Sequence, residues 1–240
     1  MFIGIGNPIP EIANLPGVSR PGGGGGSAFE YTAIDNSFSM EFDGTASYFQ
    51  GPDISSLDNA SAFSISFWFK PNTLSVNHRI MSKYLDSNNR TSLSLFTTTF
   101  SINVSRGGLQ TGEVAYPVES PIPWKHIAVV FDGTQTGNAD RLKCWFNKVP
   151  QSINFGSSTI PSLTANTAGK NFNIGALDTG SSILNPVDGK LDEVAVWGGT
   201  AISESTIEAI YDATANNPGK VADLSETPEG QPTAWYRMGD

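Results

Sequence analysis

The sequence is poor in cysteine and in charged residues. Its one cysteine, Cys144, excludes a disulfide within the chain. Cys144 alternates with Leu142 and Phe146, which predicts a small buried hydrophobic side chain and not a reactive thiol. Charged residues make up 15% of the 240 residues. The surface is therefore expected to consist mainly of Ser, Thr, Asn and Gly, which suit hydrogen bonding more than charge pairing.

Basic residues and histidines are scarce as well. The chain has 14 Lys and Arg against 23 Asp and Glu, a net charge of -9. This balance argues against a nucleic-acid partner, because a phosphate backbone requires clustered positive charge. The two histidines, His78 and His126, lie far apart and form no local metal-ligand spacing. His126 alternates with Ala128 and Val130, as expected of a hydrogen-bonded histidine in a strand.

Long apolar runs are missing too. No stretch approaches the length of a membrane span, so membrane insertion is not expected. The stretch Met1 to Pro8 has neither a basic segment nor a sustained apolar one, unlike a signal peptide. We expect synthesis in a cytoplasm without ordinary secretion, and a place in a virion or cell-surface assembly. A phage particle released by lysis would meet that condition.

Residues 1–27 are expected to form an extended arm and linker, followed by one domain over residues 28–240. Four prolines in the arm exclude a helix or a central strand, and the five glycines Gly22 to Gly26 form a hinge. Two interpretations stay open. The segment is either a disordered tail or an arm that docks on a neighbouring subunit through its apolar residues Ile3, Ile5, Ile9, Ile12 and Leu15.

Alternating strand patterns fill most of the remaining chain. Residues 63–69 carry Phe or Ile at every second position, and residues 38–42 and 127–131 show the same period of two. This period is typical of half-buried strands. We predict a core made of Phe42, Phe63, Ile65, Phe67, Phe69, Ile127, Val129, Phe131, Cys144, Phe146, Val194 and Val196.

Trp68 falls on the opposite face of its strand from this aromatic row. On a concave sheet face a tryptophan is suited to stack against the apolar face of a sugar ring, so Trp68 is our candidate for ligand binding. The alternative is that Trp68 packs beneath a covering segment.

A short helix is predicted near residues 203–213. Ser203 is a suitable N-cap, and Ile207, Ile210 and Tyr211 mark one apolar face. We expect this helix to form a lid on the rim of the domain.

Four stretches resemble, in order, the strands of one family: residues 63–71, 124–133, 142–149 and 189–197, the last leading into the predicted helix. Together they resemble a laminin-G-like, concanavalin A-like lectin/glucanase jelly roll of the kind found in phage and bacterial surface proteins. The resemblance implies an all-β fold, a two-sheet antiparallel β-sandwich. Lys148 departs from it, because the family usually has an Asn-Gly turn there, which leaves the turn type open.

The tail from Ala234 to Asp240 resembles the strand that usually opens domains of this family. Either the tail returns to complete a sheet, or the natural protein continues beyond Asp240. We favour the first, because an exposed strand rich in aromatic residues would be a sticky edge.

Catalytic signatures do not accompany the resemblance. Glycoside hydrolases of this fold carry alternating acidic residues on one strand, and no Glu-x-Asp-x-Glu occurs here. The stretch Asp178 to Ser181 reads like the loop of an aspartic protease, but that chemistry needs a second copy or a symmetric dimer. We therefore predict a protein that is not an enzyme, with a glycoside hydrolase as the remote alternative.

A structural calcium is a further implication of the resemblance. Family members often hold one with a carboxylate near the start of the closing strand, and Asp192 occupies that place. Asp43, in the early Asp-Gly turn, would supply a second oxygen, although capping of the turn is its ordinary role. Because Asp192 shares parity with Val194 and Val196, its side chain is expected to point inward, where it needs a cation or hydrogen-bond donors.

Two function classes stay open. The first is a structural or adhesive subunit of a larger assembly, such as a phage virion surface protein, anchored by residues 1–27. The alternative is a free-standing glycan-binding module that uses rim loops and a concave sheet. The expected partners are accordingly other protein subunits or glycans.

Overall fold

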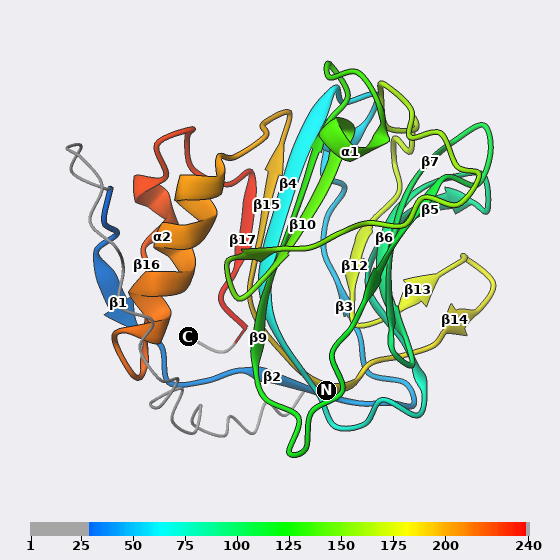
Figure 1. Ribbon diagram of the computed structural model, residues 1–240. Coiled ribbons are helices and arrows are strands. Elements are labelled where there is room, and N and C mark those ends of the chain that lie inside the picture. The colour runs from blue at the N-terminus through cyan, green and yellow to red at the C-terminus, as the bar shows by residue number, and fades with distance from the viewer. Residues whose placement is uncertain (1–28, 239–240) are drawn as a thin grey trace.

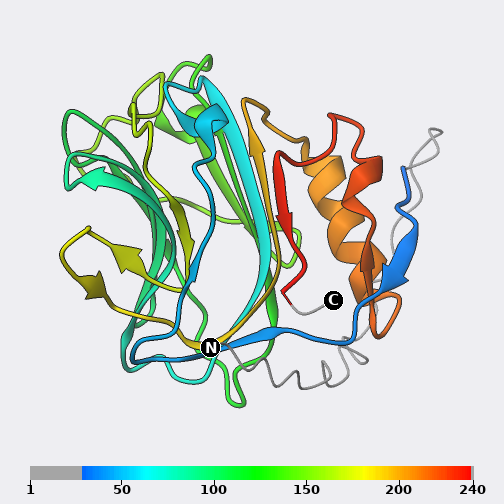
Figure 2. The ribbon, with the colours of Figure 1, turned by 180° about the vertical axis from the view of Figure 1, so that it is seen from behind.

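The computed structural model describes residues 29–238, which form two packed antiparallel sheets and one long helix (Figures 1 and 2). The predicted two-sheet β-sandwich is therefore confirmed. The predicted arm, with Ile3, Ile5, Ile9, Ile12 and Leu15, lies outside the described residues.

The first sheet has seven strands in the order β11, β10, β9, β4, β15, β17, with β2 paired to β15. Their bounds are β2 Met40–Asp43, β4 Ala62–Pro71, β9 Lys125–Asp132, β10 Leu142–Phe146, β11 Val149–Pro150, β15 Asp188–Gly198 and β17 Ala234–Tyr236.

The second sheet has six strands in the order β3, β12, β5, β6, β7, β8. They are β3 Phe49–Gln50, β5 Asn77–Asp86, β6 Asn89–Phe96, β7 Thr99–Arg106, β8 Thr111–Ala115 and β12 Phe172–Ile174.

Two small strand pairs and four helical segments complete the described chain. The pairs are β1 Ala33–Asp35 with β16 Lys220–Ala222, and β13 Leu177–Asp178 with β14 Ile183–Leu184. The helical segments are α1 Asn138–Arg141, α2 Glu204–Ala215 and the 3-10 turns Ser55–Leu57 and Leu224–Glu226. Within residues 29–238 no helix is long and apolar enough to cross a membrane.

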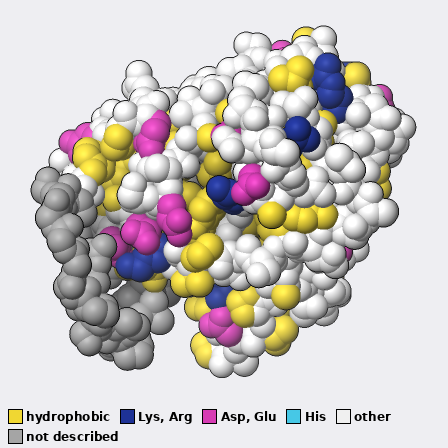
Figure 3. All heavy atoms as spheres, turned by 45° about the horizontal axis from the view of Figure 1, so that its top comes forward, with side chains coloured by type: hydrophobic (Ala, Val, Ile, Leu, Met, Phe, Trp, Pro, Cys, Tyr) yellow, Lys and Arg dark blue, Asp and Glu magenta, His cyan; other side chains and the backbone are white. Residues whose placement is uncertain are grey.

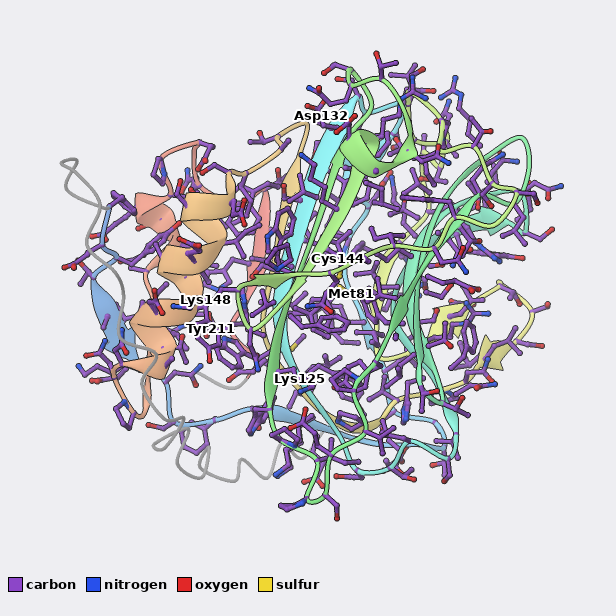
Figure 4. All side chains as sticks on the ribbon, viewed as in Figure 1. Met81, Lys125, Asp132, Cys144, Lys148 and Tyr211 are labelled. Atoms are coloured by element: carbon purple, nitrogen blue, oxygen red, sulfur yellow. The ribbon has the colours of Figure 1, made fainter. Side chains whose placement is uncertain are left out.

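The core lies between the two sheets, and all twelve predicted core residues belong to it. In strands of the seven-stranded sheet such as β4 and β9, every second side chain points inward, as the alternation in the sequence predicts. The six-stranded sheet contributes the side chains that face them, including Leu93 and Phe100. Cys144 and Met81 point into this layer (Figure 4). Burial raises the pKa of the Cys144 thiol, which keeps the thiol protonated as predicted. Outside, the face seen in Figure 3 is mostly uncharged, with charged side chains scattered over it.

Helix α2 covers a sheet face and is not the predicted lid on the rim. Ser203 is its N-cap and accepts a hydrogen bond from the Thr206 amide, as expected. Figure 1 shows α2 lying along the outer side of the seven-stranded sheet. Its apolar face packs with small strand residues such as Ala128 and Ala195 in a second hydrophobic cluster. The outer face of that sheet is therefore a second, smaller core.

The tail returns to the sheet. Strand β17 pairs antiparallel with β15, with Trp235 opposite Ala195. The Trp235 indole donates a 2.6 Å hydrogen bond to Glu193 Oε2, and Arg237 contacts the other oxygen of the same carboxylate at 3.4 Å. This aromatic strand therefore extends the edge of the seven-stranded sheet, as favoured from the sequence.

The hairpin between β10 and β11 shows which type of turn contains Lys148. Asn147 and Lys148 have φ of 48° and 61°, so both central residues are left-handed, as a type I′ turn requires. Lys148 reaches helix α2, where its Nζ lies 2.6 Å from Asp212 Oδ1 and above the ring of Tyr211 (Figure 4). The lysine therefore ties the hairpin to the helix.

Replacing Lys148 by glycine should change the free energy of unfolding by less than about 1 kcal/mol. Relief of the left-handed strain, roughly 1 kcal/mol, offsets the loss of an exposed ion pair worth at most about 1 kcal/mol. Lys148→Ala loses the pair but keeps the strain, and should be about 1 kcal/mol less stable than Lys148→Gly. Urea unfolding of both variants tests this. Equal stabilities would show that the turn is not strained.

Candidate functional site

Trp68 is buried and does not offer its ring to a sugar. Its side chain is 4% exposed, because helix α2 lies over it and the Tyr211 ring stacks on it with the centroids 5.9 Å apart. The His126 ring lies 5.3 Å from the Trp68 ring and 6.2 Å from the Tyr211 ring, so the three rings form one cluster. This is the covered arrangement that the sequence left open as the alternative, and it corrects the assignment of Trp68 to ligand binding.

A β-bulge changes the direction of Asp192. The pairing of β15 with β4 shifts register between Asp192 and Ala195, and Glu193 within the bulge has a φ of 49°. Asp192 therefore pairs with Trp68 and shares its outer face, whereas Val194 points into the core. The predicted inward direction of Asp192 is wrong, because parity arguments fail across an extra residue.

The structure does not bring Asp192 and Asp43 together as calcium ligands. Asp43 caps its own turn, and hydrogen bonds from the Ser47 side chain and from the amides of residues 45–47 hold its pKa well below the usual range. It pairs with Asp188, four residues along β15 from Asp192 and thus about 13 Å away. Asp192 accepts instead from Asn36 Nδ2 at 2.9 Å. Over the described range, no group of three or more acidic, histidine or cysteine side chains could hold a metal ion.

His126 is a buried, neutral strand histidine. Its Nε2 lies 2.7 Å from Ser66 Oγ, and burial lowers its pKa to about 3. Because the unfolded chain binds this proton near pH 6.5, the stability contributed by neutral His126 is complete above pH 6.5 and is lost progressively as the pH falls toward 3.

We expect the free energy of unfolding to fall between pH 6.5 and pH 4.5, before most carboxylates titrate. His126→Gln, which retains a partner for Ser66, should reduce this slope. Some slope should remain, because burial also lowers the pKa of His78. Urea unfolding at several pH values measures both slopes. Identical slopes for the wild type and the variant would contradict the assignment to His126.

The outer face of the six-stranded sheet carries an unbroken polar row. Strand register places Gln50, Asn173, Ser82, Ser92, Asn103 and Thr111 side by side across all six strands. Beside this row, the register aligns Arg79, Ser94, Ser101 and Glu113. We call these ten residues, together with Arg90, the polar face. Hairpin β13–β14 lies on the same side of the sheet and bounds it, since Gln50 Nε2 donates to Asp178 Oδ2 at 3.3 Å (Figure 1).

Arg79 and Arg90 lie over the small residues of this face. Arg79 Nη1 donates to Ser94 Oγ at 2.9 Å, and Arg90 Nη2 donates to Asn103 Oδ1 at 3.2 Å. Thr111 also donates to that Asn103 oxygen, at 3.1 Å. The serines and asparagines are buried, whereas both arginines are half-buried. The two arginines therefore meet solvent, together with Gln50 and Glu113 on the two edge strands.

The hydrogen bonding of this face is incomplete. Four of its buried polar atoms have no partner within the described chain: Arg79 Nε, Arg90 Nε, Ser92 Oγ and Asn173 Oδ1. Such groups are few in folded proteins, because each carries a desolvation cost. By contrast, the hollows of about 660 and 310 Å³ that flank α2 have no unpartnered buried side-chain atom among their described lining residues. The polar face is therefore the best candidate for a binding site.

Sequence reasoning missed the polar face, although its signal was present. In β6 and β7, Ser92, Ser94, Ser101 and Asn103 alternate with the core row. Such alternation is ordinary for any solvent-facing strand. The strand order, which joins the polar residues of six separate segments, cannot be read from spacing.

A family model of the concanavalin A-like lectin/glucanases superfamily matches residues 43–208. The fold is similar to that of a candidate carbohydrate-binding protein from Bacteroides ovatus, with a TM-score of 0.60 and 15% identity over 88% of this chain and 53% of that one. It is similar to the CBM40 domain of the Ruminococcus gnavus IT-sialidase, with a TM-score of 0.53 and 12% identity over 78% of this chain and 100% of that one.

The NanB sialidase of Streptococcus pneumoniae also contains a similar fold, with a TM-score of 0.55 and 14% identity. The match covers 76% of this chain and 28% of the sialidase. No curated protein sequence matches the chain. At these identities the similarities concern the fold alone.

Proposed function

The chain belongs to the concanavalin A-like lectin/glucanases superfamily, and on that premise we propose that it is a non-enzymatic, lectin-like module that binds glycans through its polar face. The observation that carries the proposal is the row of hydroxyl, amide and guanidinium groups across six strands. Sugar hydroxyls both donate and accept hydrogen bonds, so they suit a face that presents hydroxyl, amide and guanidinium groups.

The carboxylates of the face support binding without hydrolysis. Among the residues of the polar face one carries a carboxylate, Glu113 on the exposed edge strand, and Asp178 borders the face on hairpin β13–β14. Glycoside hydrolysis needs two carboxyl groups about 5 to 9.5 Å apart. As further support, the Ruminococcus gnavus CBM40 domain has been solved bound to α2,3-sialyllactose.

A glycan array probed with the full-length chain tests this proposal, with heat-denatured protein as the control. We expect binding to a subset of glycans, and we expect Asn103→Ala to weaken it, because that amide oxygen holds both Arg90 and Thr111 in place. Binding no stronger than that of the denatured chain would contradict the proposal.

A second role, as a structural or adhesive subunit of an assembly such as a phage virion, rests on residues 1–27. Phe29 and Phe38, which follow that segment in the sequence, are 42% and 43% exposed, so two apolar side chains are available for contact there. Deleting residues 1–27 should leave the melting temperature unchanged and abolish incorporation into the assembly. Normal incorporation of the shortened chain would overturn this role.

A further inference from the structure

We propose that the polar face selects glycans that carry a carboxylate, such as uronic or sialic acids, through the guanidinium groups of Arg79 and Arg90. This inference rests on the proposed glycan-binding function and names the class of ligand. The two arginines are positively charged, and no acidic side chain of the described residues forms an ion pair with them.

Neither arginine forms an ion pair within residues 29–238. The buried lysines, in contrast, form ion pairs with acidic residues. Lys83 lies 2.8 Å from Asp53 and 2.6 Å from Asp58, and Lys125 pairs with Glu119. In a protein with a net charge of -9, two half-buried arginines without an ion pair lie together on one face. Burying a charge costs free energy unless the charge is paired. An anionic ligand would supply the negative charge that pairs with these two arginines.

The arginines are held in position to receive such a ligand. Each uses one terminal nitrogen to bond the sheet, which leaves Arg79 Nη2 and Arg90 Nη1 without a protein partner in the described part of the chain. The Phe96 ring supports the Arg79 guanidinium, 4.7 Å from its centroid. A planar guanidinium matches the two oxygens of a carboxylate, and a fixed one loses less conformational entropy on binding.

The electrostatics of the face agree with this geometry. Burial, together with the positive charge of Arg90, lowers the pKa of Arg79 to about 10. The acidic groups nearby do not neutralise the pair. Asp86 interacts with Arg90 only through space and is held by Asn88 and Asn89, while Glu113 lies exposed on the edge strand. A bound carboxylate would reduce the repulsion between the arginines and should bind more weakly as salt increases.

The test measures the affinity of the full-length chain for matched acidic and neutral glycans by calorimetry. The probes are 3′-sialyllactose against lactose, and oligogalacturonate against its methyl ester. The variants are Arg79→Gln, Arg90→Gln and Arg79→Lys. The control is Lys143→Gln, which removes one exposed positive charge from the outer face of the other sheet.

We expect the acidic member of at least one pair to bind about tenfold or more tightly than its neutral partner, as charged hydrogen bonds allow. Either glutamine variant should remove that preference, Arg79→Lys should retain part of it, and Lys143→Gln should not change it. Equal binding of acidic and neutral glycans, or a preference that survives both glutamine variants, would overturn this inference and leave the glycan-binding function standing. Binding of neither member of any pair, together with an empty glycan array, would overturn the function as well.

Discussion

Phe67→Ala should lower the free energy of unfolding by about 3 to 5 kcal/mol, the usual cost of truncating a buried phenylalanine. Phe67 lies in the middle of β4, is fully buried, and contributes to the core between the two sheets. The close-packed strands on either side cannot collapse into the cavity, so both lost contacts and empty volume contribute. Guanidinium unfolding of the variant, followed by tryptophan fluorescence, measures the change.

A matched substitution isolates the effect of burial. Val118→Ala removes apolar atoms from a side chain that is 71% exposed, and should change the stability by less than about 0.5 kcal/mol. If Phe67→Ala were as mild as this control, β4 would not form the centre of the core.

Lys83→Met should cost about 3 to 5 kcal/mol, because it leaves two carboxylates next to a buried position without their cation. The Lys83 side chain is fully buried, and its Nζ contacts Asp53, Asp58 and, at 3.1 Å, the carbonyl oxygen of Ile54. These contacts connect strand β5 to the segment around the 3-10 turn Ser55–Leu57. Thermal and urea unfolding both report on the loss.

Two further variants show whether the charges cause this effect. Adding Asp58→Asn to Lys83→Met should restore part of the stability, because it removes one unpaired negative charge. Lys190→Met breaks a looser pair with Glu41, 3.8 Å apart and partly exposed, and should cost at most about 1 kcal/mol. Equal losses for Lys83→Met and Lys190→Met would contradict the role of burial.

The sequence alone is sufficient to predict the sandwich and its core. In strands such as β4 and β9 the large core side chains recur at every second position, so the inward row follows from the period of two. The N-cap at Ser203 is equally local, because a side-chain oxygen followed by an apolar helical pattern defines the start of a helix.

Predictions fail where tertiary structure overrides a local pattern. The bulge at Glu193 moves Asp192 to the opposite face, and the residues on either side give no sign of the extra position. Whether Trp68 is open or covered depends on where helix α2 docks, about 140 residues later in the sequence. The polar face depends on which strands become neighbours, and its two arginines come from segments that look like ordinary exposed strands.

The central claim, that the outer face of the six-stranded sheet binds glycans, is tested most directly by mapping a bound glycan onto the protein. In ¹H–¹⁵N NMR spectra of the full-length chain, titration with a glycan bound on the array should shift the amide signals of β5, β6 and β7 and the side-chain amide of Asn103. The signals of helix α2, on the far side of the molecule, should stay in place (Figure 2). Shifts confined to α2 or to the rim loops, with β5 to β7 unchanged, would contradict the account.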